Sequence, residues 1–174
     1  MKMFVTPTWH INSIYRLSPQ DLLNHGIKGV IVDLDNTLLA WNEHDHTPQL
    51  RSWAQDLASS GIKLYILSNN HTNRVARVAK PLDIPYQGRA YKPLSRNFKQ
   101  AMKKLDLPKE NIAVIGDQVM TDVIGANRLG LKVILVKPLV DNDNIYTGLN
   151  RFLEKIALAS IGIDRHEDWG DQLD

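Results

Sequence analysis

Residues 30 to 39 read VIVDLDNTLL, an apolar run that two acids one residue apart interrupt. The segment Val30 to Leu34 is rich in Val, Ile and Leu, which predicts a strand buried on both faces. Side chains two positions apart in a strand point to the same side, so Asp33 and Asp35 could both reach one ligand if the strand opens into a loop there. The stretch thus predicts a buried strand whose end carries two acids.

Strand-like and helix-like segments alternate along the chain. Three more runs rich in Val, Ile and Leu predict strands at Lys63–Leu67, Ile112–Ile115 and Lys132–Val136. Helices are expected at residues 18–26, 47–61, 72–80, 94–105 and 121–129. The first two have a cap residue and proline at the start and glycine at the end. This alternation predicts a parallel, doubly wound α/β sheet, in which ligands bind outside the carboxyl ends of the strands.

The composition fits a single domain covering residues 1–174. The hydrophobic fraction of 43% is ordinary for a globular protein of this length. Lys and Arg total 21 against 19 Asp and Glu, so the net charge of +2 gives no reason to expect a nucleic-acid partner. The chain has no cysteine, no signal-peptide-like apolar core near its start and no stretch of about 18 apolar residues. We therefore expect a cytoplasmic protein.

Polar side chains with chemical uses follow the first three predicted strands. They are Asp33, Asp35, Asn36 and Thr37; Ser68, Asn69 and Asn70; and Gly116, Asp117, Gln118, Thr121 and Asp122. Lys92 lies just before the helix expected at 94–105. Because ligands bind at the carboxyl ends of such strands, we expect acids, a hydroxyl and a lysine to converge on one edge of the sheet.

This set of side chains suits a metal ion and a phosphate group together. Mg²⁺ prefers hard oxygen ligands, so Asp33 and Asp117, with Asp122 as a further candidate, are suited to hold it. Crowded acids also need a cation, because like charges repel and raise one another's pKa. Lys92 and Ser68 are suited instead to phosphate oxygens, one through charge and one through a hydrogen bond.

The two acids of the first stretch have different tasks in this hypothesis. Asp33 attacks phosphorus in line to give an aspartyl-phosphate, and Asp35 protonates the leaving oxygen and later activates water. Each feature alone has an ordinary structural explanation, such as a helix cap at Ser68 or a solvated charge at Lys92. Their order at the ends of successive α/β units argues against chance.

Four segments resemble the motifs of the haloacid dehalogenase superfamily of phosphohydrolases: DLDNTL at 33–38, SN at 68–69, KP at 92–93 and GDQxxTD at 116–122. The resemblance spans roughly residues 29–136. It implies a three-layer Rossmann-like sheet, Mg²⁺ as the cofactor and an aspartyl-phosphate intermediate. By this resemblance Asp33 is the nucleophile and Asp35 the general acid/base. An acid at position 35 favours a phosphatase, because the dehalogenases of the superfamily carry none there.

The resemblance also implies binding roles for residues of the four motifs. The phosphate-binding positions are Ser68, Asn69, Lys92 and Thr37. The metal-binding positions are the Asp33 side chain, the Asp35 backbone carbonyl and the Asp117 side chain. Asp122 either binds the metal through water or orients Lys92.

The spacing of the motifs leaves no room for a cap domain over the site. Only 32 residues lie between Asp35 and Ser68, and 23 lie between Ser68 and Lys92. We therefore expect an open site, shielded at most by a short flap at residues 40–46. Such a site suits a large substrate, or a neighbouring subunit of a homo-oligomer that serves as a lid.

Within the superfamily the chain resembles the capless phosphatases of subfamily IIIA and the YqeG type, through GIKGVIVDLDNTLLAW, SNN, YKPL and GDQxxTDVIGANRLG. That group is similar to phosphatidylglycerophosphate phosphatases, so the resemblance implies this lipid as substrate, with phosphatidylglycerol and phosphate as products. It also implies a protein peripheral at the inner face of the membrane. The alternative substrates are a nucleotide, a sugar phosphate or a phosphoprotein. The alternatives to an enzyme are a receiver-like module phosphorylated on Asp and a partner-binding protein.

A last helix is expected at residues 145–163, after the loop-like DNDN at 141–144. Leu149, Phe152, Leu153, Ile156 and Ile163 fall on one side of it. The ordinary interpretation is that this side packs on the domain, and the alternative is a face for a membrane or a partner.

Overall fold

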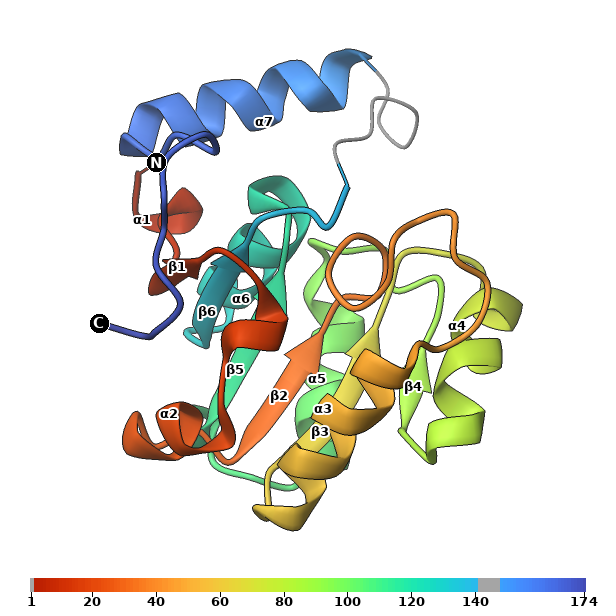
Figure 1. Ribbon diagram of the computed structural model, residues 1–174. Helices are drawn as coiled ribbons and strands as arrows, with labels where there is room; N and C mark the ends of the chain where they lie inside the picture. The colour runs from red at the N-terminus through yellow and green to blue at the C-terminus, as the bar shows by residue number, and fades with distance from the viewer. Residues whose placement is uncertain (1, 141–147) are drawn as a thin grey trace.

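The computed structural model describes residues 2–140 and 148–174. Its centre is a six-stranded sheet whose paired strands all run parallel, in the order β1-β6-β5-β2-β3-β4 (Figure 1). The strands are β1 (Trp9–Ile11), β2 (Gly29–Val32), β3 (Lys63–Leu67), β4 (Tyr86–Gln87), β5 (Ile112–Gly116) and β6 (Lys132–Val136). The predicted parallel, doubly wound α/β sheet is therefore confirmed.

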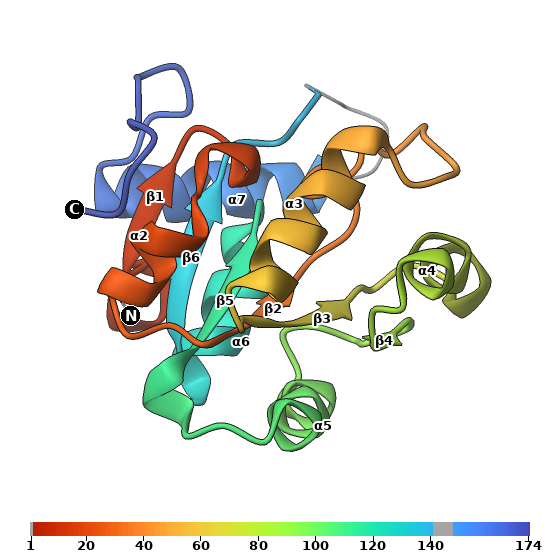
Figure 2. The same ribbon diagram turned by 60° about the horizontal axis from the view of Figure 1, so that its bottom comes forward.

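Helices cover both faces of this sheet, which gives three layers. They are α1 (Lys2–Val5), α2 (Pro19–Asn24), α3 (Pro48–Ser59), α4 (Thr72–Ala79), α5 (Ser95–Leu105), α6 (Ile124–Arg128) and α7 (Gly148–Ile161). Figure 2 shows α3 and α5 on opposite sides of the sheet. Trp53 of α3 belongs to one cluster of buried apolar residues, and Phe98 of α5 belongs to the other. No cap domain is present in the described part of the chain.

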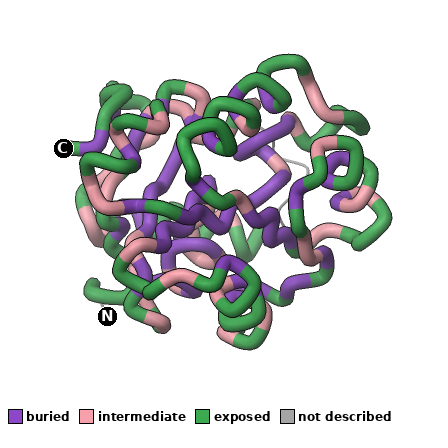
Figure 3. The backbone as a smooth tube through the Cα atoms, turned by 90° about the horizontal axis from the view of Figure 1, so that it is seen from below, coloured by how far each residue is buried: buried purple, intermediate pink, exposed green. Residues whose placement is uncertain are grey.

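Strand β2 lies in the middle of the sheet and contributes residues to both clusters of buried apolar side chains. Its four residues are buried; Val30 and Val32 join the cluster under α3, whereas Ile31 joins the cluster under α5. Buried positions accordingly gather in the interior of the molecule, and exposed positions surround them (Figure 3). The strand ends at Val32, before Asp33, so the acid pair lies just beyond the sheet rather than within the predicted strand 30–34.

The predicted helix starts at 18 and 47 are confirmed by their caps. The Ser18 hydroxyl accepts a hydrogen bond from the Asp21 N–H at 3.1 Å, and the Thr47 hydroxyl accepts one from the Leu50 N–H at 3.1 Å. These bonds satisfy backbone donors that have no partner inside the helix. The helix expected at 72–80 ends at Ala79, and the chain continues in a 3₁₀ turn over Lys80–Leu82.

The helix expected at 121–129 does not form as one regular element. The chain makes a π-helical turn over Val119–Val123, and α6 follows from Ile124 to Arg128. The first backbone N–H groups of this turn donate to the carboxylate of Glu154, at 2.7 Å from Val119 and 3.1 Å from Met120. The start of the turn is therefore set by a contact with α7 that no local sequence pattern encodes.

Helix α7 does not pack on the domain through the apolar side that the sequence predicts, so the ordinary interpretation of that side was wrong. Residues 145–147 of that prediction, and the DNDN segment, lie outside the described residues. Four of the five apolar residues expected to pack are exposed: Leu149, Phe152, Leu153 and Ile156. Only Ile163, beyond the helix, packs partly against the core, and α7 is instead anchored by Ala157 and Leu158. None of the described helices is long and apolar enough to cross a bilayer.

Candidate active site

The carboxyl ends of β2, β3 and β5 meet at one edge of the sheet, as the sequence predicts. Asp33 follows β2, Ser68 follows β3 and Asp117 follows β5. Val32 pairs in register with both Ile66 and Ile115, so neighbouring strands end at almost the same height. Asp33, Ser68 and Asp117 are all buried, which means that the protein holds polar groups at this edge at a cost in solvation.

Lys92 lies at the centre of the site, between two carboxylates. Its ammonium donates to Asp33 Oδ1 at 2.9 Å and to Asp122 Oδ1 at 2.6 Å, and its side chain is only 3% exposed. Burial alone would lower the pKa of Lys92, but the charges of Asp122 and Asp33 outweigh it and raise the pKa above its usual value. Lys92 is therefore a fixed positive charge beside the Asp33 carboxylate.

Three acids come together around this lysine. Asp33, Asp117 and Asp122 each offer a carboxylate oxygen, and these oxygens lie within 4.8 Å of one another. Burial raises the pKa of Asp33 to about 6, against the opposing effect of Lys92, and the Asp122 charge adds to the increase. Burial and the charge of Asp33 likewise raise the pKa of Asp117. Three carboxylates against one ammonium leave the cluster short of positive charge, so a hard divalent cation such as Mg²⁺ fits it.

The glycine of the fourth motif is required by this packing. A Cβ atom on Gly116 would lie 2.2 Å from Cγ of Asp122, so no other residue fits there without displacing that carboxylate. Asp122 uses Oδ1 for Lys92 and Oδ2 for the Gln118 N–H at 3.3 Å. Of the two roles predicted for Asp122, these contacts favour the orientation of Lys92.

Asp35 does not join the acid cluster, although it lies only two residues from Asp33. Arg74 donates to Asp35 Oδ1 through Nε at 2.9 Å and Nη2 at 2.7 Å, and Asn70 Nδ2 donates to Oδ2 at 2.8 Å. Arg74 also donates to the Glu43 carbonyl at 2.6 Å, which connects the predicted flap at 40–46 to this acid. Asn70 is one of the polar residues that the sequence places after the second predicted strand, whereas Arg74 was not predicted, because it stands within an ordinary helical pattern.

Of the other predicted phosphate-binding residues, Thr37 and Ser68 are buried and Asn69 is exposed, and all three have hydrogen-bond partners within the protein. Asn69 accepts from the Lys92 N–H at 2.7 Å and donates to the Lys92 carbonyl at 3.1 Å, so its side chain holds the lysine backbone. The Thr37 hydroxyl donates to Asp117 Oδ1 at 3.3 Å. The Ser68 oxygen accepts from the Asn70 N–H at 3.1 Å, and its own proton can still be donated.

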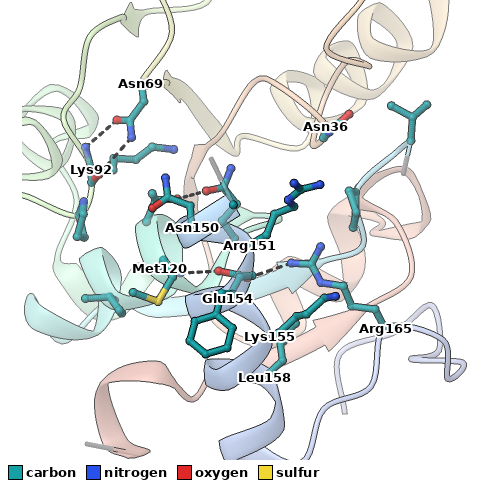
Figure 4. Close-up of a pocket in the computed structure, with 18 of the residues that line it drawn as sticks. Asn36, Asn69, Lys92, Met120, Asn150, Arg151, Glu154, Lys155, Leu158 and Arg165 are labelled. Atoms are coloured by element: carbon teal, nitrogen blue, oxygen red, sulfur yellow. Dashed lines mark hydrogen bonds and ion pairs between the residues drawn. The ribbon is translucent and has the colours of Figure 1, made fainter. Parts of the chain in front are cut away.

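A cavity of about 1010 Å³ opens beside the acid cluster, and α7 forms one of its walls (Figure 4). Asn36, Asn69 and Lys92 line it from the strand ends, whereas residues between Gly148 and Leu158 line it from α7. None of residues 40–46 lines it. The flap therefore forms no part of this cavity, which the last helix lines instead, and shielding of the acids by the flap stays a prediction.

Two charged residues connect this wall to the acid cluster. Glu154 of α7 accepts the two backbone N–H groups that begin the π-helical turn, and it accepts from Arg165 Nη2 at 3.0 Å. The same Arg165 nitrogen donates to the backbone carbonyl of Asp117 at 2.8 Å. Helix α7 is thus fixed to the loop that carries Asp117 and Asp122. Glu154 is not among the residues of the apolar side that the sequence predicts for this helix, and that pattern gave no signal of the contact.

Asn36 adds a buried acceptor on the strand side of the cavity. The residue is 2% exposed, has a left-handed backbone with φ of 60°, and lines the cavity. Asparagine tolerates this conformation better than most residues. Its Oδ1 atom has no hydrogen-bond partner among the described residues. A buried acceptor of this kind is suited to a donor on a bound ligand.

Comparisons with known proteins agree with this geometry. A family model described as haloacid dehalogenase-like hydrolase matches residues 39–130, a range that contains Ser68, Lys92, Asp117 and Asp122 but begins after Asp33. "Probable phosphatase YqeG" of Bacillus subtilis is 38% identical over 169 residues, which cover 97% of this chain and 98% of that protein.

Solved structures share the fold at low sequence identity. One is 3-deoxy-D-manno-octulosonate 8-phosphate phosphatase from Moraxella catarrhalis, in complex with magnesium, phosphate and the sugar acid, with a TM-score of 0.50 at 21% identity. The match covers 83% of this chain and 91% of that one. Another is a haloacid dehalogenase-like hydrolase from Brucella suis, with a TM-score of 0.52 at 11% identity, covering 75% and 99% of the two chains.

Proposed function

This chain belongs to the haloacid dehalogenase-like hydrolases, and from that premise we propose that it is a Mg²⁺-dependent phosphomonoesterase that forms an aspartyl-phosphate on Asp33. The observation that carries the proposal is the position of Lys92, whose ammonium lies between Asp33 and Asp122 at the edge of the sheet. A buried carboxylate next to a fixed cation can approach a phosphoryl group that this cation also attracts. The name of the Bacillus subtilis relative supports the same activity.

The acid cluster gives the metal its place in this proposal. Asp33 and Asp117 would hold Mg²⁺ through their side chains, with the Asp35 backbone carbonyl as a further ligand, whereas Asp122 would orient Lys92. When bound, Mg²⁺ supplies positive charge that offsets the three carboxylates and the phosphoryl oxygens. Thr37 would orient the Asp117 carboxylate for the metal, since its hydroxyl donates a hydrogen bond to that carboxylate.

The first chemical step joins Asp33 to phosphorus. A carboxylate oxygen of Asp33 forms a bond to phosphorus while the bond from phosphorus to the ester oxygen breaks. Lys92 and the Ser68 hydroxyl bind the oxygens of the transferring group. The ester oxygen leaves with the electron pair of the broken bond and takes a proton from Asp35, so that an alcohol departs.

The second step releases phosphate and restores both acids. Asp35, now ionised, takes a proton from water, and the water oxygen bonds to phosphorus as the bond to Asp33 breaks. Asp35 must carry a proton at the first step and none at the second. Arg74 and Asn70 hold its two oxygens, so we assign to them the orientation of Asp35.

Phosphatidylglycerophosphate is the substrate that we propose. The support is the exposed apolar side of α7, formed by Leu149, Phe152, Leu153 and Ile156, next to the cavity that leads to Lys92. An apolar helix side beside a polar cavity suits a molecule with an anionic headgroup and acyl chains, presented by a membrane surface. In this proposal the protein is cytoplasmic and binds peripherally at the inner face of the membrane. The second candidate is another large or soluble phosphomonoester.

Hydrolysis of p-nitrophenyl phosphate in the presence of Mg²⁺ tests the activity. We expect turnover by the parent protein, loss of turnover in Asp33→Asn, and no comparable loss in Asp56→Asn, which changes an exposed acid of α3. Turnover that survives Asp33→Asn would contradict the enzyme mechanism. A stable phosphoaspartate without turnover would favour a receiver-like module.

Phosphate release from different substrates tests the lipid proposal. Phosphatidylglycerophosphate in detergent micelles is compared with sugar phosphates, nucleotides and phosphopeptides at equal concentration. We expect the highest kcat/KM with the lipid. A preference for a soluble nucleotide or sugar phosphate would overturn the substrate and leave the phosphatase activity standing.

A further inference from the structure

The cavity beside the acid cluster is lined by an excess of positively charged side chains in the part that lies away from the strand ends. Four cationic residues line the cavity away from the strand ends: Arg128, Arg151, Lys155 and Arg165. Glu154 is the single Asp or Glu among the described residues that line the cavity. The chain as a whole is nearly neutral, with a net charge of +2, so this concentration is local. A cavity wall of this kind attracts anions.

Some of these cations are already used inside the protein. Lys92 is held by Asp33 and Asp122, and Arg165 is held by Glu154 and the Asp117 carbonyl. Arg128 and Lys155 form no ion pair with any acid in residues 2–140 and 148–174. These two are accordingly free to meet a charged group that enters the cavity.

Arg151 and Lys155 stand four residues apart on α7, which brings their side chains to the same side of the helix. Figure 4 shows the labelled Arg151 and Lys155 extending from α7 into the cavity. Like charges at this spacing repel one another, and a bound anion reduces that repulsion. Arginine also presents a planar donor pair that matches two phosphate oxygens.

The two ends of the cavity are chemically distinct. At one end, Lys92 and Asn69 line the cavity where we propose that the reacting phosphoryl group binds. At the other end, the cavity is lined by residues of α7. A volume of about 1010 Å³ exceeds what one phosphate group needs and is at the upper end of small-molecule sites. A substrate that reaches Asp33 therefore extends toward the cations of α7.

We propose that Arg151 and Lys155, with Arg128, form a second anion-binding subsite that selects phosphomonoesters carrying a second phosphate group. The inference rests on the proposed phosphatase function and refines its substrate class. The second phosphate can be a diester within a lipid headgroup or a free phosphate on a soluble molecule, because both present the same oxygens. Helix α7 thus determines specificity as a wall of the site, in a fold that has no cap domain.

A pair of ligands that differ only in the second phosphate tests this subsite. The dissociation constants of glucose 6-phosphate and glucose 1,6-bisphosphate are measured by calorimetry with Mg²⁺, in an Asp33→Asn background that binds without turnover. We expect the bisphosphate to bind more tightly. In Arg151→Gln/Lys155→Gln the preference should fall roughly tenfold, because two partly exposed charge contacts are lost. Lys103→Gln, which changes an exposed cation of α5 outside the cavity, should keep the full preference.

Turnover of phosphatidylglycerophosphate in micelles separates the two sources of the second phosphate. The double variant should lose kcat/KM for this lipid by a similar factor. Equal binding of the two sugars, or an unchanged preference in the double variant, would overturn the subsite. A loss restricted to micelles would also overturn it, since attraction of α7 to the micelle surface would then explain the loss. Failure of Asp33-dependent hydrolysis of p-nitrophenyl phosphate would instead refute the phosphatase function. The single variant Lys155→Gln serves if the double variant does not fold.

Discussion

Replacement of Asp33 by asparagine should make the metal-free protein more stable at neutral pH, although it removes the proposed nucleophile. Asp33 is buried, and its pKa lies at about 6 in the folded protein against an ordinary value of 3.8. The folded state therefore binds this proton more tightly than the unfolded state does. Stability contributed by protonation is present at low pH and is lost as the pH rises through about 6.

The magnitude follows from the shift in pKa. About two pKa units correspond to roughly 3 kcal/mol between the protonated and ionised forms. Asparagine resembles the protonated acid in charge at every pH, and we expect Lys92 to keep Asp122, which lies 2.6 Å away in the parent, as its partner in the variant. We therefore expect Asp33→Asn to exceed the parent by roughly 3 kcal/mol at about pH 7.5 and to match it at about pH 4. For a chain of this size that difference is roughly 6–12 °C in Tm.

Thermal and urea unfolding in EDTA measure this difference, with Asp56→Asn as the matched control. The control changes an exposed acid and should follow the parent within about 0.5 kcal/mol at every pH. Addition of Mg²⁺ should raise the Tm of the parent and reduce the advantage of Asp33→Asn. A variant that is less stable than the parent in EDTA at about pH 7.5, or a difference that does not shrink at low pH, would show that burial does not raise the pKa of Asp33 in the folded protein.

Three further substitutions test single contacts of the site. Glu154→Ala leaves two backbone N–H groups without their acceptor, so we expect a loss of about 1–3 kcal/mol in unfolding free energy and a smaller Mg²⁺-induced rise in Tm. Gly116→Ala forces a Cβ atom against Asp122, and we expect about 10²-fold lower kcat/KM for p-nitrophenyl phosphate in a protein with normal circular dichroism. Arg74→Ala removes the ion pair of Asp35, which should lower the unfolding free energy by about 1–3 kcal/mol and lower kcat more than it raises KM.

For each of these three predictions, one experimental result would contradict the expected role of the residue. An unchanged response to Mg²⁺ in Glu154→Ala would show that α7 does not support the acid cluster. Full activity in Gly116→Ala would show that Asp122 needs no fixed position. An effect of Arg74→Ala on KM alone would assign Arg74 to substrate binding rather than to Asp35.

The sequence predicted the centre of the fold and the acids because both are local patterns. The apolar runs that became β2, β3, β5 and β6 are long enough to be recognised, and polar residues follow three of them directly. Strands β1 and β4 were not predicted, since three and two residues are too short to show a periodic pattern. They are the two edges of the sheet and depend on pairing with β6 and β3.

Contacts between distant segments limited the prediction of the site. Asp35 pairs with Arg74, 39 residues along the chain, and nothing in the helical pattern around Arg74 distinguishes it from a surface charge. The role of α7 was missed for the same reason, because amphipathicity shows that a helix has two sides but not which surface each side meets. Glu154, which is not on the predicted apolar side, turned out to face the domain, whereas Phe152 is exposed.

A covalent phosphoryl group on Asp33 is the most direct test of the whole account. The protein is mixed with a phosphomonoester and Mg²⁺, quenched in acid during turnover, digested and analysed by mass spectrometry. We expect a phosphorylated peptide that contains Asp33, with an acyl-phosphate linkage that alkali cleaves, and no such peptide from Asp33→Asn. Turnover without any phosphorylated peptide, or a phosphoryl group on another residue, would contradict this expectation.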